Sequence, residues 1–186
     1  MATVTAPIKT VWIIGLSASG KTTLARLLIK RLQENGHPCV IIDGSEARDL
    51  FENKLGFDPE SRRKQTARIR NLAQWAISQR IIPVVAMIHP FEDDRRKCRA
   101  EIPGYYEVYL ECPLEECMRR DDKNVYGPAV AGTVANVVGL DIPYDDPATV
   151  ELRLHSDRQT PEALLETLWT TIRDRLIDNR LDIHNP

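Results

Sequence analysis

The sequence lacks several features that would point to particular classes of protein. No apolar run approaches the roughly 18 residues that a membrane-spanning helix needs. The 4 cysteines form no C-x-x-C pair, so we expect reduced, partly buried thiols. The formal net charge of -2 provides no general attraction to nucleic acid or acidic lipid. These absences favour a soluble protein with small-molecule substrates, and exclude neither an enzyme nor a binding module.

What is present is the composition of one globular domain. Hydrophobic residues make up 42% of the chain and charged residues 28%, and we see neither an internal repeat nor a low-complexity segment. A chain of 186 residues suits a single domain, which we assign to residues 1–186. The N-terminus has no basic-then-apolar leader, so we expect a cytoplasmic protein.

One motif stands out directly after the apolar run that ends at Ile14. It fits G-x-x-x-x-G-K-[ST] at every fixed position. Backbone N–H groups of such a turn can cradle phosphates, Lys21 adds charge for the outer phosphates, and Thr22 offers a hydroxyl to Mg²⁺. A chance coincidence in a solvated turn is disfavoured by the apolar run before it and the amphipathic pattern after it. We therefore expect ATP to be bound by Gly15, Ser17, Ala18, Ser19, Gly20, Lys21, Thr22 and Thr23.

Apolar runs and amphipathic segments alternate along most of the chain, which is typical of an α/β fold. We predict five strands, near residues 10–14, 39–43, 83–88, 105–111 and 151–154. Helices are predicted directly after the motif and at residues 59–79, 92–100, 114–120 and 161–176. The expected architecture is a P-loop NTPase three-layer sandwich with a five-stranded parallel sheet. Residues 122–147 break this rhythm with many Gly, Pro and Asn residues, and we predict that they form a lid, hereafter the lid segment.

Asp43 ends the second predicted strand, at the sheet edge where ligands bind in such folds. Its carboxylate could orient Mg²⁺ together with Thr22, or accept the proton of an attacking hydroxyl. It could also cap the following helical segment, and both roles could hold at once.

Several further residues have two possible roles. Arg48 and Arg62 could bind an anionic acceptor or be solvated. Phe57 could stack on a base or hold its turn against the core, and His89 could lie near a reacting phosphate or be structural. Arg119 or Arg120 could close over ATP, or simply stabilise the C-terminal end of a helix by its positive charge. We assign the ATP contact to Arg120.

Together these residues resemble the adenylylsulfate kinase (APS kinase) family. The resemblance runs from about residue 10 to residue 155 and is carried by residues 15–23, Asp43-Gly44 with Arg48, residues 55–57, Arg62, Pro90, residues 119–121 and residues 139–144. It implies transfer of the γ-phosphate of ATP, with Mg²⁺, to the ribose 3′-hydroxyl of adenosine 5′-phosphosulfate, and commonly a homodimer. It also implies that Lys21, Asp43 and Arg120 are catalytic.

The same resemblance implies the residues that contact the acceptor. Asp43 would lie near the attacking hydroxyl, Arg48 and Arg62 would clamp the anionic group, and Phe57 would stack on the base. The remaining implied contacts are Gln65, His89, Pro90, Phe91, Val137 and Val138.

The chain departs from the family pattern mainly around the acceptor. Ser45 and Glu46 replace a carboxylate and an amide, Gln65 replaces an asparagine, and His89-Pro90-Phe91 replaces Ser-Pro-Tyr. In the lid segment, residues 135–139 replace Lys-Gly-Phe-Thr-Gly, so a stacking aromatic and a cation are missing.

Three hypotheses follow from these departures. The chain could be an APS kinase with compensating contacts, or a kinase for another nucleotide such as cytidine diphosphoramidate, whose smaller base suits valine in the lid segment. It could also be a module that binds ATP without catalysis. A simple nucleoside monophosphate kinase is a further alternative, although it should not need the pattern at residues 139–144.

Overall fold

The computed structural model describes residues 6–178. Its centre is a five-stranded, fully parallel sheet in the order β2-β3-β1-β4-β5. The strands are β1 (Thr10–Ile14), β2 (Cys39–Asp43), β3 (Ile82–Met87), β4 (Tyr105–Glu111) and β5 (Leu152–His155). The predicted α/β fold is confirmed. The predicted bounds hold for β1, β2 and β4, and shift by one residue for β3 and β5.

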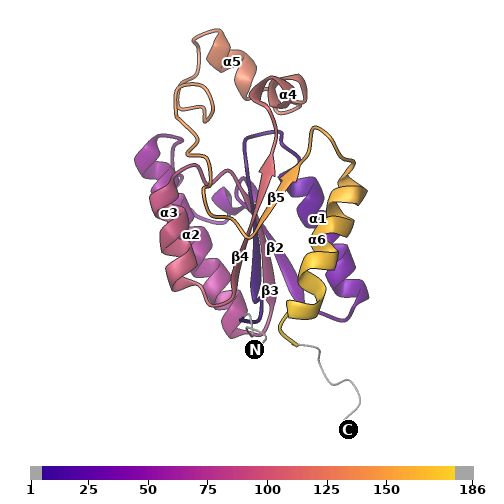
Figure 1. Cartoon of the computed structure of the whole chain (residues 1–186). Helices are drawn as coiled ribbons and strands as arrows, with labels where there is room; N and C mark the ends of the chain where they lie inside the picture. Colours follow the sequence, from indigo (N-terminus) through magenta and orange to yellow (C-terminus); the bar gives the residue numbers. More distant parts are fainter. Residues whose placement is uncertain (1–5, 179–186) are drawn as a thin grey trace.

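Helices cover both faces of this sheet. Figure 1 shows α1 (Lys21–Glu34) and α6 (Pro161–Ile172) on one side, and α2 (Pro59–Ser78) and α3 (Glu92–Glu101) on the other. The chain between β4 and β5 begins with α4 (Leu114–Arg119). One-turn 3₁₀ helices, η1 (Glu46–Arg48) and η2 (Arg173–Arg175), follow β2 and α6. The last predicted helix is therefore shorter than expected, because its final turn tightens into η2.

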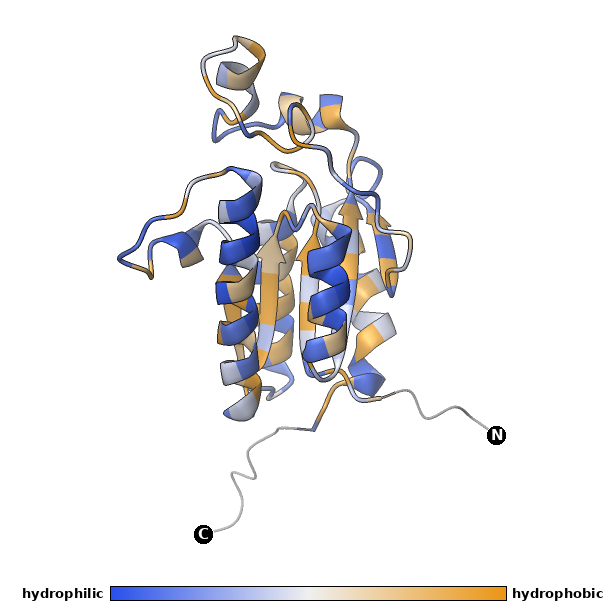
Figure 2. Cartoon of the chain, turned by 90° about the vertical axis from the view of Figure 1, so that its left-hand side faces the viewer, coloured by the Kyte–Doolittle hydropathy of each residue, from blue (hydrophilic) through white to orange (hydrophobic). Residues whose placement is uncertain are grey.

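Local sequence explains where the longer helices begin. Both α2 and α6 have proline in their first turn, and the residue before each supplies a cap: Asp58 accepts from the Ser61 N–H at 2.9 Å, and Thr160 from the Ala163 N–H at 3.3 Å. The sheet lies between two apolar cores, because strands covered by helices on both faces are apolar on both faces. Figure 2 shows this as orange strands behind helices with blue outer surfaces.

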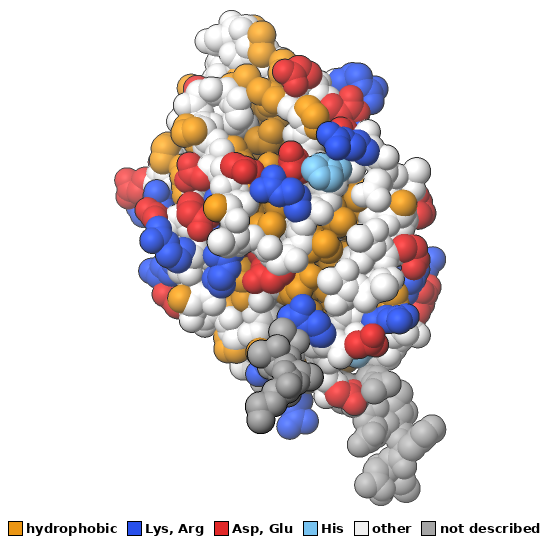
Figure 3. Space-filling model, viewed as in Figure 1, with side chains coloured by type: hydrophobic (Ala, Val, Ile, Leu, Met, Phe, Trp, Pro, Cys, Tyr) orange, Lys and Arg blue, Asp and Glu red, His pale blue; other side chains and the backbone are white. Residues whose placement is uncertain are grey.

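The lid segment crosses the carboxyl edge of the sheet (Figure 1). It contains one short helix, α5 (Tyr126–Val130), that the sequence pattern did not predict, and an isolated bridge between Val138 and Ile142. Charged side chains of both signs are interspersed on the face seen in Figure 3. Within residues 6–178, no helix has both the length and the apolar character that a membrane crossing requires.

Gly15 fixes the approach of the phosphate-binding turn to β4. A Cβ atom built on it would lie 2.5 Å from the Leu110 carbonyl oxygen, and its φ of +149° is one that L side chains rarely adopt. We expect Gly15→Ala to lower the free energy of unfolding by about 3 kcal/mol, from overpacking together with backbone strain. Gly132→Ala is the control, because its φ is +72° but nothing lies within 4 Å; it should cost only about 1 kcal/mol. Urea unfolding measures both, and equal losses would contradict this account.

Candidate active site

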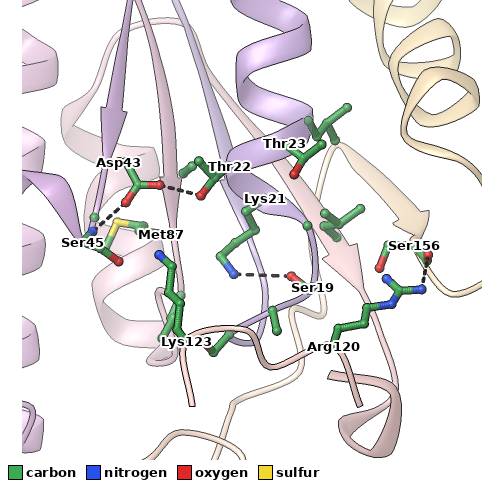
Figure 4. A pocket seen from close by; sticks show the side chains of 18 of the residues that line it. Ser19, Lys21, Thr22, Thr23, Asp43, Ser45, Met87, Arg120, Lys123 and Ser156 are labelled. Atoms are coloured by element: carbon green, nitrogen blue, oxygen red, sulfur yellow. Dashed lines mark hydrogen bonds between the residues drawn. The ribbon is translucent and has the colours of Figure 1, made fainter. Parts of the chain in front are cut away.

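A cavity of about 760 Å³ opens at the carboxyl edge of the sheet. Its walls are the turn before α1, the ends of β2 and β3, the junction of α4 with the lid segment, and the start of α6 (Figure 4). This is the edge at which ligands bind in open α/β sheets. The sequence-predicted phosphate turn and Asp43 therefore face one common space.

The phosphate turn is built by unusual backbone angles. Gly20 has φ +95° and Ala18 has φ +58°. Lys21 is buried, and its ammonium donates to the Leu16 carbonyl and to Ser19 Oγ at 3.4 Å. Burial lowers the pKa of Lys21 from 10.5 to about 8 because the charged form is desolvated. The turn thus presents a buried cation and α1's N-terminal end to the cavity, an arrangement that suits phosphate.

Asp43 lies between the phosphate turn and the start of η1. Its Oδ2 accepts a hydrogen bond from Thr22 Oγ1 at 2.6 Å, while Oδ1 accepts from the backbone N–H of Ser45 at 2.8 Å and of Glu46 at 3.4 Å. It therefore does cap the start of η1, while one oxygen stays beside the threonine hydroxyl. A hydroxyl and a carboxylate at this separation are oxygen donors of the type that Mg²⁺ prefers, so this pair fits the metal.

Two arginines and an aromatic ring lie together on the η1 and α2 side. The guanidinium carbons of Arg48 and Arg62 lie 4.5 and 5.6 Å from the ring centroid of Phe57. Phe57 is 56% exposed and lines the cavity with Arg62, so its side chain is not simply part of the core.

The hydrogen bonds of these arginines end on neutral carbonyls. Arg48 donates to the carbonyls of Leu55 and Gly56, both at 3.0 Å, and Arg62 to those of Phe57 at 2.7 Å and Asn136 at 2.8 Å. Burial and the neighbouring Arg48 lower the pKa of Arg62 to about 10. Within residues 6–178 neither guanidinium has a carboxylate within ion-pair distance, so both are suited to receive an anion, although only Arg62 lines the cavity in this structure.

Gln65 lies one turn after Arg62 on α2 and is 3% exposed. Neither polar atom of its amide has a hydrogen-bond partner among the described residues. Phe91 is partly buried, with the Arg63 guanidinium carbon 4.4 Å from its ring centroid, and Pro90 is buried. None of Gln65, Pro90 and Phe91 lines the cavity in this structure.

The side chain of His89 lies in the core and not in the cavity. It is 1% exposed, its φ is +51°, and its ring lies 5.4 Å from that of Trp12. Burial and nearby arginines lower its pKa to about 3, so the imidazole is neutral. Of the two roles considered for His89, the structure favours the structural one, since its ring packs beside Trp12 and does not line the cavity.

Val137 and Val138 are also buried, at 5% and 2% exposure, rather than facing the acceptor side. Val137 packs with Cys112, Cys117 and Tyr126 beneath the lid segment. The Asp141 carboxylate accepts from the N–H groups of residues 136 and 137, which turns the chain inward. Neither valine lines the cavity in this structure.

The two arginines at the end of α4 separate clearly. Both pair with Glu116, Arg119 at 2.7 Å and Arg120 at 2.5 Å. Arg120 also lines the cavity and donates to the Ser156 carbonyl at 3.1 Å, whereas Arg119 is exposed. The lining residues that were not predicted include three polar ones: Lys123, Ser156 and Gln159. Lys123 could have been found as the first cation of the lid segment, and Figure 4 shows it close to Lys21. Ser156 and Gln159 carry no local signal.

The comparisons with known proteins agree with this geometry. The family model described as adenylylsulphate kinase matches residues 8–155. The chain is 33% identical to an adenylyl-sulfate kinase of Thermodesulfovibrio yellowstonii over 89% of this chain and 84% of that one. It is 35% identical to a probable adenylyl-sulfate kinase of Bacillus subtilis over 89% and 85%.

Solved structures give the same answer. An APS kinase of Mycobacterium tuberculosis, in complex with AMPPNP and APS, superposes with a TM-score of 0.80 at 33% identity, covering 88% of this chain and 97% of that one. A shikimate kinase of Aquifex aeolicus shares the fold alone, with a TM-score of 0.56 at 13% identity over 89% and 96%.

The lowered pKa of Lys21 predicts a pH-dependent affinity for a triphosphate. Phosphates favour the charged ammonium, so above pH 8 binding must take up a proton. We expect the affinity for AMPPNP to fall about tenfold between about pH 8 and about pH 9.5, accompanied by proton uptake. Isothermal titration calorimetry in buffers of different ionisation enthalpy measures both quantities. Lys21→Met should bind more weakly and without this pH dependence; a wild-type affinity that stays flat would contradict the assignment.

Proposed function

The chain belongs to the adenylylsulphate kinase family, and on that premise we propose that it transfers the γ-phosphate of ATP to the 3′-hydroxyl of adenosine 5′-phosphosulfate. The observation that carries the proposal is the position of Asp43. It lies between a phosphate-binding turn with a buried lysine and a pair of arginines beside an exposed phenylalanine. A nucleotide donor and an anionic nucleotide acceptor can meet at such a carboxylate.

On the donor side, the amides of the phosphate turn and Lys21 hold the ATP phosphates. Thr22 and Asp43 would hold Mg²⁺, which when bound neutralises charge on the phosphates. Arg120 and Lys123 enter the cavity from the lid side, where they can stabilise charge that develops on the transferred group.

On the acceptor side, Arg48 and Arg62 clamp the anionic end of the nucleotide and Phe57 stacks on its base. Asp43 accepts the proton of the 3′-hydroxyl as that oxygen forms a bond to the γ-phosphorus and the bond to the ADP oxygen breaks. Gln65 has an unpartnered amide that can reach the acceptor if α2 and the lid segment close on it. The segment after β3, which contains His89, Pro90 and Phe91, contributes to acceptor binding indirectly, through its backbone conformation.

Residues 1–186 would act as one kinase domain with the lid segment at 122–147. We place the protein in the cytoplasm and expect a homodimer, as the family resemblance implies. A surface groove lined by Val40, Leu50 and Trp75 is one apolar area that a dimer could cover.

One observation favours a second acceptor. Phe57 is the single aromatic residue that lines the cavity in residues 6–178, and Val137 is buried away from it. A base stacked on one ring only is held less tightly, by roughly 1 to 3 kcal/mol for each stacking partner lost. Cytidine diphosphoramidate, with its smaller base, is therefore the alternative acceptor.

An acceptor panel separates these functions. We expect ATP-dependent ADP release with adenosine 5′-phosphosulfate to exceed that with ordinary nucleoside monophosphates, because only acceptors with a second anionic group engage both arginines; nucleoside diphosphates, which carry a second phosphate, are included in the panel for comparison. A clear preference for cytidine diphosphoramidate would replace the acceptor and keep the kinase. If none of the nucleotides is phosphorylated under conditions in which AMPPNP binds, the result would support an ATP-binding module and refute the proposal.

Asp43→Asn tests the proton acceptor. The amide oxygen can still accept from Thr22, but it cannot take a proton from the hydroxyl, so we expect kcat to fall by about 10²- to 10⁴-fold. The matched control is Asp49→Asn, a nearby exposed residue that pairs with Lys54 at 3.0 Å and should keep normal turnover. Initial rates of ADP release give the comparison. A wild-type kcat in a folded Asp43→Asn variant would remove this residue from the chemistry.

A further inference from the structure

The lid segment returns to the body of the protein at Asp145, where it meets the start of α3. The Asp145 N–H donates to the Pro90 carbonyl at 3.0 Å, and its Oδ2 accepts from the Glu92 N–H at 3.0 Å. Phe91, the residue before α3, supplies no side-chain cap of its own. The lid segment thus provides the cap that the local sequence of α3 lacks.

Arg95 lies directly beneath this contact and is fully buried. Its Nη2 donates to the Asp145 carbonyl at 2.7 Å, and its Nη1 donates to the His89 carbonyl at 2.9 Å. Glu92 Oε2 accepts from Nε at 3.0 Å and from Nη2 at 2.8 Å, and Glu107 Oε1 lies 3.9 Å from Nε. One guanidinium therefore joins the end of the lid segment to the chain that follows β3.

That chain leads straight to the cavity. Met87 and Ile88 line the cavity, and the Ile88 carbonyl accepts from the Gly15 N–H at 3.4 Å, at the start of the phosphate turn. His89, which follows Ile88 and whose carbonyl accepts from Arg95, has a left-handed backbone conformation. Arg95 itself does not line the cavity, so any effect it has on the reaction acts through other residues.

We propose that Arg95 and Asp145 form a hinge clamp, in which Arg95 is a positioning residue that fixes the return of the lid segment relative to the strand end beside the phosphates. This inference rests on the proposed kinase function, since it assigns the clamp a part in aligning the lid segment over the reactants. The planar fork of arginine is required, because one group must reach two carbonyls from different segments.

The exposed partner gives the cleaner test. Asp145→Ala removes the cap from α3 but leaves the buried arginine in place, whereas Asp145→Asn keeps an oxygen that can accept from Glu92. We expect Asp145→Ala to raise amide hydrogen exchange in the lid segment about fivefold and to lower kcat by a similar factor, the effect of one lost cap. Asp145→Asn should restore both values. The affinity for AMPPNP should change less than about twofold, because the phosphate turn is intact.

Asp146→Ala is the matched control. Asp146 is the neighbouring exposed aspartate and pairs with Arg153 at 3.3 Å, but it does not cap α3. Arg95→Lys keeps the charge without the fork and should exceed Asp145→Ala in both effects. The proposal is overturned if Asp145→Ala or Arg95→Lys matches Asp146→Ala in lid-segment exchange, or if exchange in α1 rises as much as in the lid segment. Exchange is measured without turnover, so a wild-type protein inactive on every acceptor would refute the proposed function and leave this test standing.

Discussion

The hydrogen bond between Thr22 and Asp43 links the phosphate turn to the carboxyl end of β2, and the arrangement of the site depends on it. These residues belong to α1 and β2, and β2 is not a neighbour of β1 in the sheet, since β3 lies between them. The parallel register brings them level: Ile14 pairs with Met87, and Asp43 pairs with Ala86. The bond therefore depends on three apolar strands ending at the same height. The residues proposed to bind the donor and those proposed to bind the acceptor are thus positioned by the same edge of the sheet.

Charge distribution explains why this edge suits two anionic ligands. Lys21 is a buried ammonium held by a carbonyl and a hydroxyl, and Arg48 and Arg62 donate to carbonyls. Buried and partly buried cations with neutral partners are costly, and a bound phosphate or sulfate offsets that cost. The positive charge available to an anionic ligand is therefore concentrated at this edge, although the net charge of the whole chain is only -2.

The parts that could be predicted from the sequence depend on short-range pattern. β1 is an apolar run that is buried along its whole length, β2 and β4 are largely apolar, and Pro59 and Pro161 mark helix starts by their fixed backbone angle. The parts that could not be predicted depend on contacts distant in sequence. His89 turns inward because of one left-handed residue, Val137 is buried by a core beneath the lid segment, and the cap of α3 comes from Asp145, far along the chain. None of these has a local signal, although the motif that binds phosphate does.

We place the meeting point of the two substrates at Asp43. A crystal structure with AMPPNP, Mg²⁺ and adenosine 5′-phosphosulfate measures this most directly. We predict the ribose 3′-oxygen within hydrogen-bond reach of the Asp43 carboxylate, about 2.6 to 3.2 Å, with Phe57 against the base. An acceptor bound with its 3′-oxygen outside that reach, and with its anionic group away from Arg48 and Arg62, would contradict it.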